Sequence, residues 1–307
     1  YHEILIDNIR QIKNVIQEQA CDTLRILNSS YGDVFNQDEA VSTKLEKIFK
    51  EMLTQCVTDD NIHVTNGYTR AIVNFNDGFI IKYYSNVMES LIKNAKMKTT
   101  NNNDPLTRKS AIESIGFITV KHLKDLQNDI YKKIETIFDG FEDYEMDPRI
   151  GDVGSNVRMA CIKTIIDIMI ALYKMNTPET KELFKKYIVT VLQKVIKQLA
   201  EKMASVRKIA GNEMQKFFYE MKDNDEELEK IIPHYRELKN MFLTDIDFDE
   251  NDNVYNMKWV EPEFAYVKIM PLATYETYSN YFIEGLIRSI ACISEDVQKC
   301  SLDELKK

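Results

Sequence analysis

Apolar residues recur at steps of three and four through the middle of the chain. One series runs from Val157 to Leu172 and a second from Phe184 to Leu199. This spacing places apolar side chains on one face of an α-helix. The run Asn176-Thr177-Pro178 separates the two series and is typical of one helix ending and another starting. We therefore predict two consecutive amphipathic helices.

Two more helices follow from the same periodicity. Their apolar positions are Val206, Ala210, Met214, Phe217 and Met221 in the first, and Tyr275, Tyr278, Phe282, Leu286, Ser289 and Ile293 in the second. The helix over residues 184–199 carries lysines that we expect on its polar face, at Lys185, Lys186, Lys194 and Lys197. Helices thus follow one another with short connections.

A three-part pattern recurs in these and other segments. A cation or amide comes first, a small residue follows three places later, and a large aliphatic residue follows four places after that. The instances are Gln17/Ala20/Leu24, Arg108/Ala111/Ile115, Arg158/Cys161/Ile165 and Arg207/Ala210/Met214, with a looser member starting at Arg70. The last three full instances start 50 and 49 residues apart, close to the roughly 40–47 residues of HEAT and armadillo repeats.

The pattern has a physical reason in stacked helices. The small residue allows a neighbouring helix to approach, and the aliphatic residue fills the space between layers. We expect the cation to bond the turn of an adjacent repeat, because a half-buried charge is costly without a partner. Stacking buries surface that no helix pair could bury alone. The predicted fold class is all-α, an α-solenoid of HEAT/armadillo-like helical repeats.

Two polar stretches interrupt the helices. Residues 98–105 form the first, and the acidic stretch 243–264, which contains Trp259, forms the second and longer one. We interpret the first as a loose loop between helices, in which Pro105 suits the start of the next helix. A connection as long as the second is uncommon inside repeats and suggests an ordered insertion. The predicted organisation is therefore helical repeat in 1–60, HEAT-like repeats in 61–242, a long acidic loop in 243–264 and further repeat in 265–307.

Composition agrees with helices and narrows the partners. The 307 residues are 44% hydrophobic, with only 9 Gly and 6 Pro, too few for the turns of an all-β protein. The net charge of −9 speaks against nucleic acid as the main partner, because phosphate binding needs a basic face. No apolar run approaches the length needed to cross a bilayer, so no membrane insertion is expected. Because the chain starts at Tyr1, we expect a piece of a longer protein.

The sequence gives little support for a metal site or a reactive thiol. The five cysteines, Cys21, Cys56, Cys161, Cys292 and Cys300, are scattered, which favours reduced thiols in a cytosolic protein, with Cys161 and Cys292 as small core residues. The four histidines, His2, His63, His122 and His234, lie far apart, so none has a neighbour at the spacing that metal ligands need. A calcium loop starting at Asp245 would need Gly and Glu where Glu250 and Asn256 stand. A solvated acidic loop, or one that docks on a basic partner, fits better.

The segment Gly151-Asp152-Val153-Gly154 is a turn between predicted helices. It lacks the pattern that wraps phosphates, so no cofactor and no enzyme activity are expected. Glycine permits unusual backbone angles, and Asp152 or Ser155 is suited to cap the following helix. Trp259 has two interpretations, as an anchor of the long loop on the helices or as an exposed interface residue.

Several ordered segments resemble one family. They are Glu142 to Arg158 with its Gly-Asp-Val-Gly turn, Pro233 to Leu238, Lys258 to Pro262, Leu272 to Tyr275, and upstream Asn66 to Ala71. Together they cover roughly residues 60–295 and are similar to the C-terminal domain of the tubulin-folding cofactor D family. Asn156 departs from the family pattern, which usually has a large aromatic residue there.

The resemblance implies a function. Members of this family are cytosolic, cytoskeleton-associated chaperones that capture β-tubulin. They assemble and disassemble the αβ-tubulin heterodimer with cofactors C and E and an Arf-like small GTPase, while tubulin hydrolyses GTP. The positions that we expect to contact partners are Asp152, Arg158, Lys185, Lys186, Trp259 and Tyr275. Since a fold does not fix a function, a structural or adaptor role in a microtubule-based organelle stays open.

Overall fold

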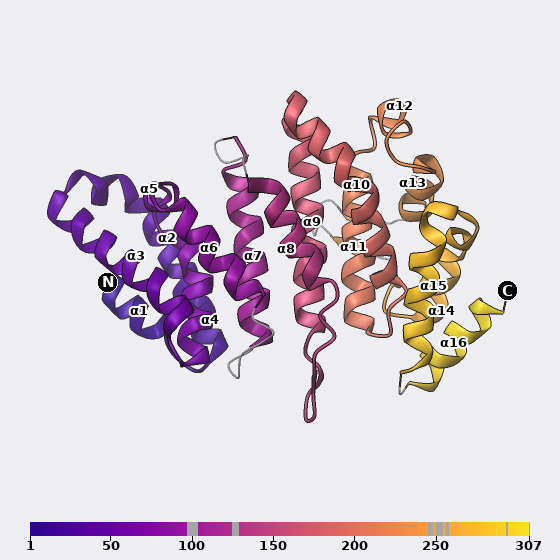
Figure 1. Ribbon diagram of the computed structural model, residues 1–307, viewed down its shortest axis with the longest axis horizontal. Helices are drawn as coiled ribbons and strands as arrows, with labels where there is room; N and C mark the ends of the chain where they lie inside the picture. The colour runs from indigo at the N-terminus through magenta and orange to yellow at the C-terminus, as the bar shows by residue number, and fades with distance from the viewer. Residues whose placement is uncertain are drawn as a thin grey trace. The chain divides into compact units, whose positions relative to one another are not determined.

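The computed structural model describes residues 1–96, 104–124, 129–244, 248–249, 254–255, 258–292 and 294–306. These described residues form sixteen α-helices, short 3-10 helices and two pairs of two-residue strands. Several helices that follow one another along the chain lie side by side within each part of it (Figure 1). The predicted all-α, helical-repeat fold class is confirmed.

The chain divides into two compact units, Tyr1–Cys161 and Ile162–Lys307. The helices of the first unit are α1 (His2–Ile9), α2 (Asn14–Gln37), α3 (Glu39–Thr58), α4 (Ile62–Ala71), α5 (Asp77–Lys82), α6 (Tyr84–Ala95), α7 (Pro105–Lys121) and α8 (Ile130–Gly140). In it, α4 packs on α3 and α7, and α6 packs on α7. Strands β1 (Met146–Asp147) and β2 (Gly151–Asp152) form an antiparallel hairpin that pairs Met146 with Asp152.

Helix α9 (Ser155–Met175) begins in the first unit and continues into the second. The other helices of the second unit are α10 (Pro178–Leu199), α11 (Ala204–Glu220), α12 (Asp225–Leu228), α13 (Tyr235–Leu243), α14 (Pro262–Ile269), α15 (Glu276–Ile290) and α16 (Glu295–Leu305). Helix α10 packs on α11 and α15, and α16 packs on α14 and α15. Strands β3 (Phe248–Asp249) and β4 (Val254–Tyr255) form the second antiparallel pair.

The predicted apolar faces form the core. The series in α9 and α10 is buried at every predicted position, and so is the series in α11. The conformation of the turn between α9 and α10 is the one that its own residues favour. Asn176 is left-handed, with φ of 56°. Thr177 and Thr180 form a reciprocal capping box ahead of α10, in which Pro178 stands in the first turn. Here local sequence alone sets both helix boundaries.

Two predictions in the second unit are wrong. Lys197 was expected on a polar face, but it is buried and its Nζ lies 2.8 Å from a Glu284 carboxylate oxygen of α15. Both faces of α10 are covered there, since α15 packs on it. Cys292 is partly exposed, because α15 ends at Ile290 before reaching it. Cys161, by contrast, is buried as predicted.

Some predictions concern residues outside the described part. The polar stretch 98–103 lies there, as do Asp245, Asp247, Glu250, Asp252 and Asn256 of the acidic loop. The four-part organisation predicted from the sequence stays a prediction, and it marks no boundary within α9, where the two compact units meet along the chain.

Candidate functional site

The cation or amide of the repeated pattern occupies the same place in four helices. Gln17, Arg108, Arg158 and Arg207 are each the fourth residue of their helix, in α2, α7, α9 and α11, and each is at most 1% exposed. The small and aliphatic residues of the pattern are buried as well. The buried cation needs partners near the start of its helix, because an isolated charge in the core is costly.

Arg108 finds its partners in the connection that follows α8. Its Nε donates to a carboxylate oxygen of Asp143 at 2.7 Å, and both side chains are 1% exposed. Its Nη2 also pairs with Glu145, whose side chain is 37% exposed. A guanidinium can bond two carboxylates at once because its donors lie in one plane. Arg108 therefore fixes the chain just before β1.

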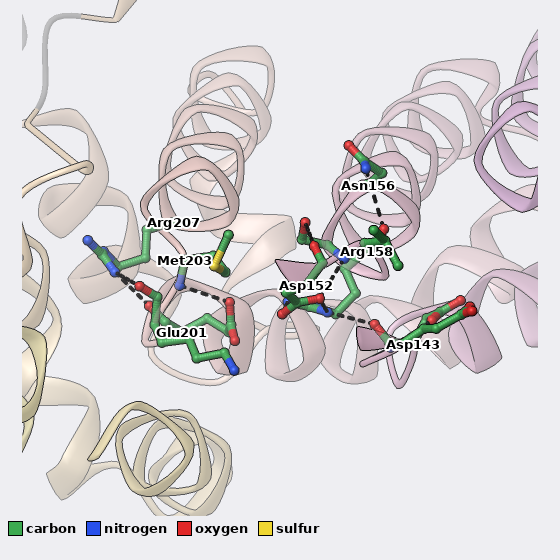
Figure 2. A network of polar contacts seen from close by, with 11 residues as sticks. Asp143, Asp152, Asn156, Arg158, Glu201, Met203 and Arg207 are labelled. Atoms are coloured by element: carbon green, nitrogen blue, oxygen red, sulfur yellow. Dashed lines mark hydrogen bonds and ion pairs between the residues drawn. The ribbon is translucent and has the colours of Figure 1, made fainter. Parts of the chain in front are cut away.

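Arg158 holds the same connection from the other end (Figure 2). Its Nη1 donates to the main-chain oxygen of Asp143 at 2.6 Å, and its Nη2 donates to Asp152 at 3.0 Å. The guanidinium also lies 4.1 Å from the ring centroid of Tyr144. The predicted bonds from the repeat cations to neighbouring turns are thus present at Arg108 and Arg158. Together the two arginines secure both ends of the β1–β2 hairpin.

The hairpin itself is shaped by short-range bonds. Gly151 has a φ of +94°, which favours glycine. Asp147 accepts bonds from the main-chain N–H groups of Arg149 and Ile150, and these donors lower the pKa of Asp147. Asp152 accepts from the N–H of Ser155, so it caps α9 as predicted. These contacts turn the Ile150 side chain, 81% exposed, into solvent.

A groove of about 530 Å³ lies beside the hairpin, within the first unit. Residues from the starts of α4 and α7 and from the hairpin line it, namely Ile62, Asp104, Pro105, Leu106, Glu145, Met146, Asp147, Pro148, Ile150, Val153 and Asn156. The lining is apolar with three carboxylates, and none of these described lining residues is a lysine, arginine or histidine. The groove can therefore accept an apolar side chain with a cation beside it.

In the second unit, Arg207 bonds only main-chain oxygens in the contacts that the structure describes. Its Nη1 donates to the carbonyl of Glu201 at 2.8 Å (Figure 2). The same nitrogen donates to the carbonyl of Lys202, also at 2.8 Å. Its Nε donates to the carbonyl of Trp259 at 3.3 Å, and its Nη2 donates to that of Val260. Arg207 thereby joins the turn before α11 to the segment before α14, again as the repeat pattern predicts.

Trp259 lies in the core of the second unit. Its side chain is wholly buried, and its Nε1 donates to Oε1 of Gln215 at 3.1 Å. The rings of Phe242 and Phe264 lie 5.6 and 5.5 Å away. A methyl group added at Gly211 would come within 2.3 Å of the indole Cγ, so only glycine lets α11 approach this closely. This burial favours the anchor interpretation over an exposed interface residue.

The six predicted contact positions have different surroundings. Arg158 and Trp259 are buried and the Asp152 side chain is 3% exposed, so we no longer expect these three side chains to touch a partner. Lys185 and Lys186 are exposed on α10. Tyr275 is half-buried and stacks on His234 at a centroid distance of 4.1 Å. The structure brings only Asp152 and Arg158 into direct contact among the described contacts of these six.

Sequence reasoning missed the partners of the buried arginines. Asp143 and Glu145 were noticed only as an acidic lead before the glycine turn, although both bond Arg108. The signal was present, since a cation at the fourth position of a helix needs a carboxylate or carbonyl nearby. Nothing in the spacing says that Asp143, 35 residues away, supplies it.

The described residues were also compared with what a membrane span and a metal site require. No helix among them is both long and apolar enough to cross a bilayer. No three of their His, Cys, Asp or Glu side chains are grouped so that they could hold a metal ion.

One family of known proteins matches part of the chain. Residues 189–307 match the family model described as "Tubulin folding cofactor D C terminal". This match confirms the predicted resemblance for that part of the chain, and it does not extend to the segment Glu142–Arg158. No curated protein and no solved structure matches the chain.

Proposed function

We propose that the chain is a tubulin-folding scaffold, because residues 189–307 match the family model described as "Tubulin folding cofactor D C terminal". It binds β-tubulin and takes part in assembly and disassembly of the αβ-tubulin heterodimer, together with cofactors C and E and an Arf-like small GTPase. It works in the cytosol and has no catalytic residues of its own. The family match is the observation that carries this proposal.

The surface chemistry agrees with a binding role for part of α10. Lys185 and Lys186 are exposed, and the Nζ of Lys186 lies 5.0 Å from the ring centroid of its neighbour Tyr187. Since both this chain and tubulin are acidic, we expect apolar contacts and selected lysines to give the affinity rather than bulk attraction. Moderately raised salt should therefore weaken tubulin binding without abolishing it.

The test is co-purification of the full chain from its native cytosol, followed by mass spectrometry of the bound proteins. We expect β-tubulin and an Arf-like GTPase to be recovered. Recovery of organelle or transport proteins in their place would refute the proposal and favour the structural or adaptor role. An unrelated helical-repeat protein of similar net charge, used as bait in the same way, serves as the control for nonspecific capture.

A pair of variants refines the test. Lys185→Ser with Lys186→Ser should lower the recovery of tubulin, because it removes two exposed cations from α10. The same change at two other exposed lysines of this unit, Lys208 and Lys230, is the matched control and should leave recovery unchanged. Equal losses in both pairs would show that net charge matters and that this face of α10 does not.

A further inference from the structure

We propose that the groove beside the β1–β2 hairpin is a docking site for a tubulin segment that presents an apolar side chain next to a lysine or arginine. This inference rests on the proposed binding of tubulin, and it adds a surface and a type of contact. The groove lies in the first unit, outside the residues that match the family.

Exposed apolar surface is the first observation. Ile150 at the hairpin is 81% exposed and Met146 is 59% exposed, although both border the groove. Leu106 and Val153 add to the same lining. Large apolar side chains held at a concave surface favour contact with another protein, since burying them removes apolar area from water. The volume of about 530 Å³ lies within the range of roughly 300–1,000 Å³ known for binding pockets.

Charge decides what kind of segment fits. Asp104 accepts bonds from Leu106 N–H at 3.1 Å and from the Thr107 hydroxyl at 3.2 Å. Asp147 accepts from two main-chain N–H groups. Neither carboxylate forms an ion pair with any residue that the structure describes. Main-chain N–H donors and, to a smaller extent, the charge of Arg149 stabilise the Asp147 carboxylate. Since neither carboxylate is paired with a cation, a cation on the partner would complement them.

The hairpin is also held in place before binding. Arg108 and Arg158 fix its two ends through Asp143 and Asp152, so Ile150 is presented on a short turn whose ends are bonded into the core. Arg149 is exposed at the same turn but does not line the groove. A surface fixed in this way loses little conformational entropy when a partner binds.

The test measures the affinity of the purified full chain for purified αβ-tubulin. We expect Ile150→Ser to weaken binding about tenfold, as loss of a central apolar contact does. Ile12→Ser is the matched control, because Ile12 is similarly exposed, at 72%, but does not line the groove. Neither variant should shift the melting temperature, since both side chains are in solvent.

The carboxylates are tested separately. Asp104→Asn combined with Asp147→Asn removes both charges. It keeps an amide oxygen to accept from the main-chain N–H groups of Leu106, Arg149 and Ile150, and it places an amide NH₂ beside the Thr107 hydroxyl, which can accept from it. We expect about threefold weaker binding and a smaller dependence on salt. A photo-crosslinker, Ile150→p-benzoylphenylalanine, should label a tubulin peptide that contains a lysine or arginine.

The outcomes separate this inference from the proposed function. If the unmodified chain binds tubulin and neither Ile150→Ser nor the asparagine pair changes the affinity, the groove is not the docking site and the proposed function stands. If the unmodified chain does not bind tubulin at all, both are wrong. A crosslinked peptide without a basic residue would refute the charge complementarity alone.

Discussion

Single side chains in the second unit show how the long connection before α14 is held. Trp259 fills a space against α11 that exists only because residue 211 is glycine. Its indole N–H is bonded to Gln215, and its carbonyl is bonded to Arg207. One residue thus joins the connection to α11 by packing, by a side-chain bond and by a main-chain bond.

Removing this side chain should be costly. We expect Trp259→Ala to lower the free energy of unfolding by about 3–5 kcal/mol, because a large cavity forms and Oε1 of Gln215 loses the indole N–H as its donor. Chemical denaturation followed by circular dichroism measures the change. Val260→Ala, at a neighbouring side chain that is 47% exposed, is the control and should change the stability by less than about 1 kcal/mol.

The close contact between Gly211 and Trp259 can be tested independently. Gly211→Ala alone should be strongly destabilising, since its methyl would overlap the indole. Once Trp259 is replaced by alanine, the methyl has room, so the two losses should be far from additive. Additive losses in the double variant would contradict the contact between Gly211 and Trp259.

A buried lysine in the first unit gives a dependence on pH. Lys133 of α8 is wholly buried, its Nζ lies 5.1 Å from the ring centroid of Tyr84, and burial lowers its pKa to about 8. Between pH 8 and the ordinary lysine pKa near 10.5, the unfolded chain binds a proton that the folded chain has released, so stability rises with pH.

Lys133→Met should therefore be more stable than the unmodified chain at pH 7, by up to about 3 kcal/mol. The advantage should shrink as the pH rises from 8 to 10.5, because the native lysine is then neutral as well. Urea denaturation of both proteins across this pH range measures the difference between their free energies of unfolding. The titration of the other groups is the same in both proteins and cancels in this difference. A difference that is constant with pH would show that Lys133 keeps its charge in the fold.

At the scale of elements, the buried arginines connect helices to hairpins and turns. Arg108 near the start of α7 bonds Asp143 beyond the end of α8, and Arg158 in α9 bonds the same residue through its carbonyl. The helices could form without these bonds, but the connection between α8 and α9 would lose its bonds to two buried side chains of the core. The repeated cation is thus a device that orders loops.

We expect Arg108→Met to lower the free energy of unfolding by about 3–5 kcal/mol, because Asp143 is left as a buried charge without its cation. Adding Asp143→Asn should recover part of the loss. The adjacent Lys109, whose ion pair with Glu113 is exposed, is the matched control, and Lys109→Met should cost less than about 1 kcal/mol. Hydrogen exchange should rise across residues 143–154 in Arg108→Met and remain unchanged in Lys109→Met.

For the whole molecule, each compact unit contains its own network of this kind. Arg108 belongs to the first unit and Trp259 to the second, and among the described contacts they share no partner. Effects at such independent sites add. Stability in repeat proteins is in any case built from local units and the contacts of neighbours.

We expect the losses from Arg108→Met and Trp259→Ala to add within about 0.5 kcal/mol in the double variant. The check is a two-by-two comparison of unfolding free energies by urea denaturation. A coupling above about 1 kcal/mol would show that the two networks depend on each other.

The sequence by itself determined the features that depend on near neighbours along the chain. The periodicity of α9, α10 and α11, the capping box at Thr177 and the cap of Asp152 on α9 were predictable, because each depends on residues within one or two turns. That the repeated cation bonds a neighbouring turn was predictable too, because a buried charge without a partner is costly. The resemblance that the family model supports over residues 189–307 was also visible in short ordered segments.

Only the tertiary structure decided which distant groups meet. Asp143 as the partner of Arg108, the burial of Lys197 against Glu284, and the close approach of Gly211 and Trp259 join residues 35 to 87 positions apart. Spacing along a chain carries no information about such pairs, because helix packing selects them. The groove beside the hairpin has the same origin, since three separate segments of the chain line it.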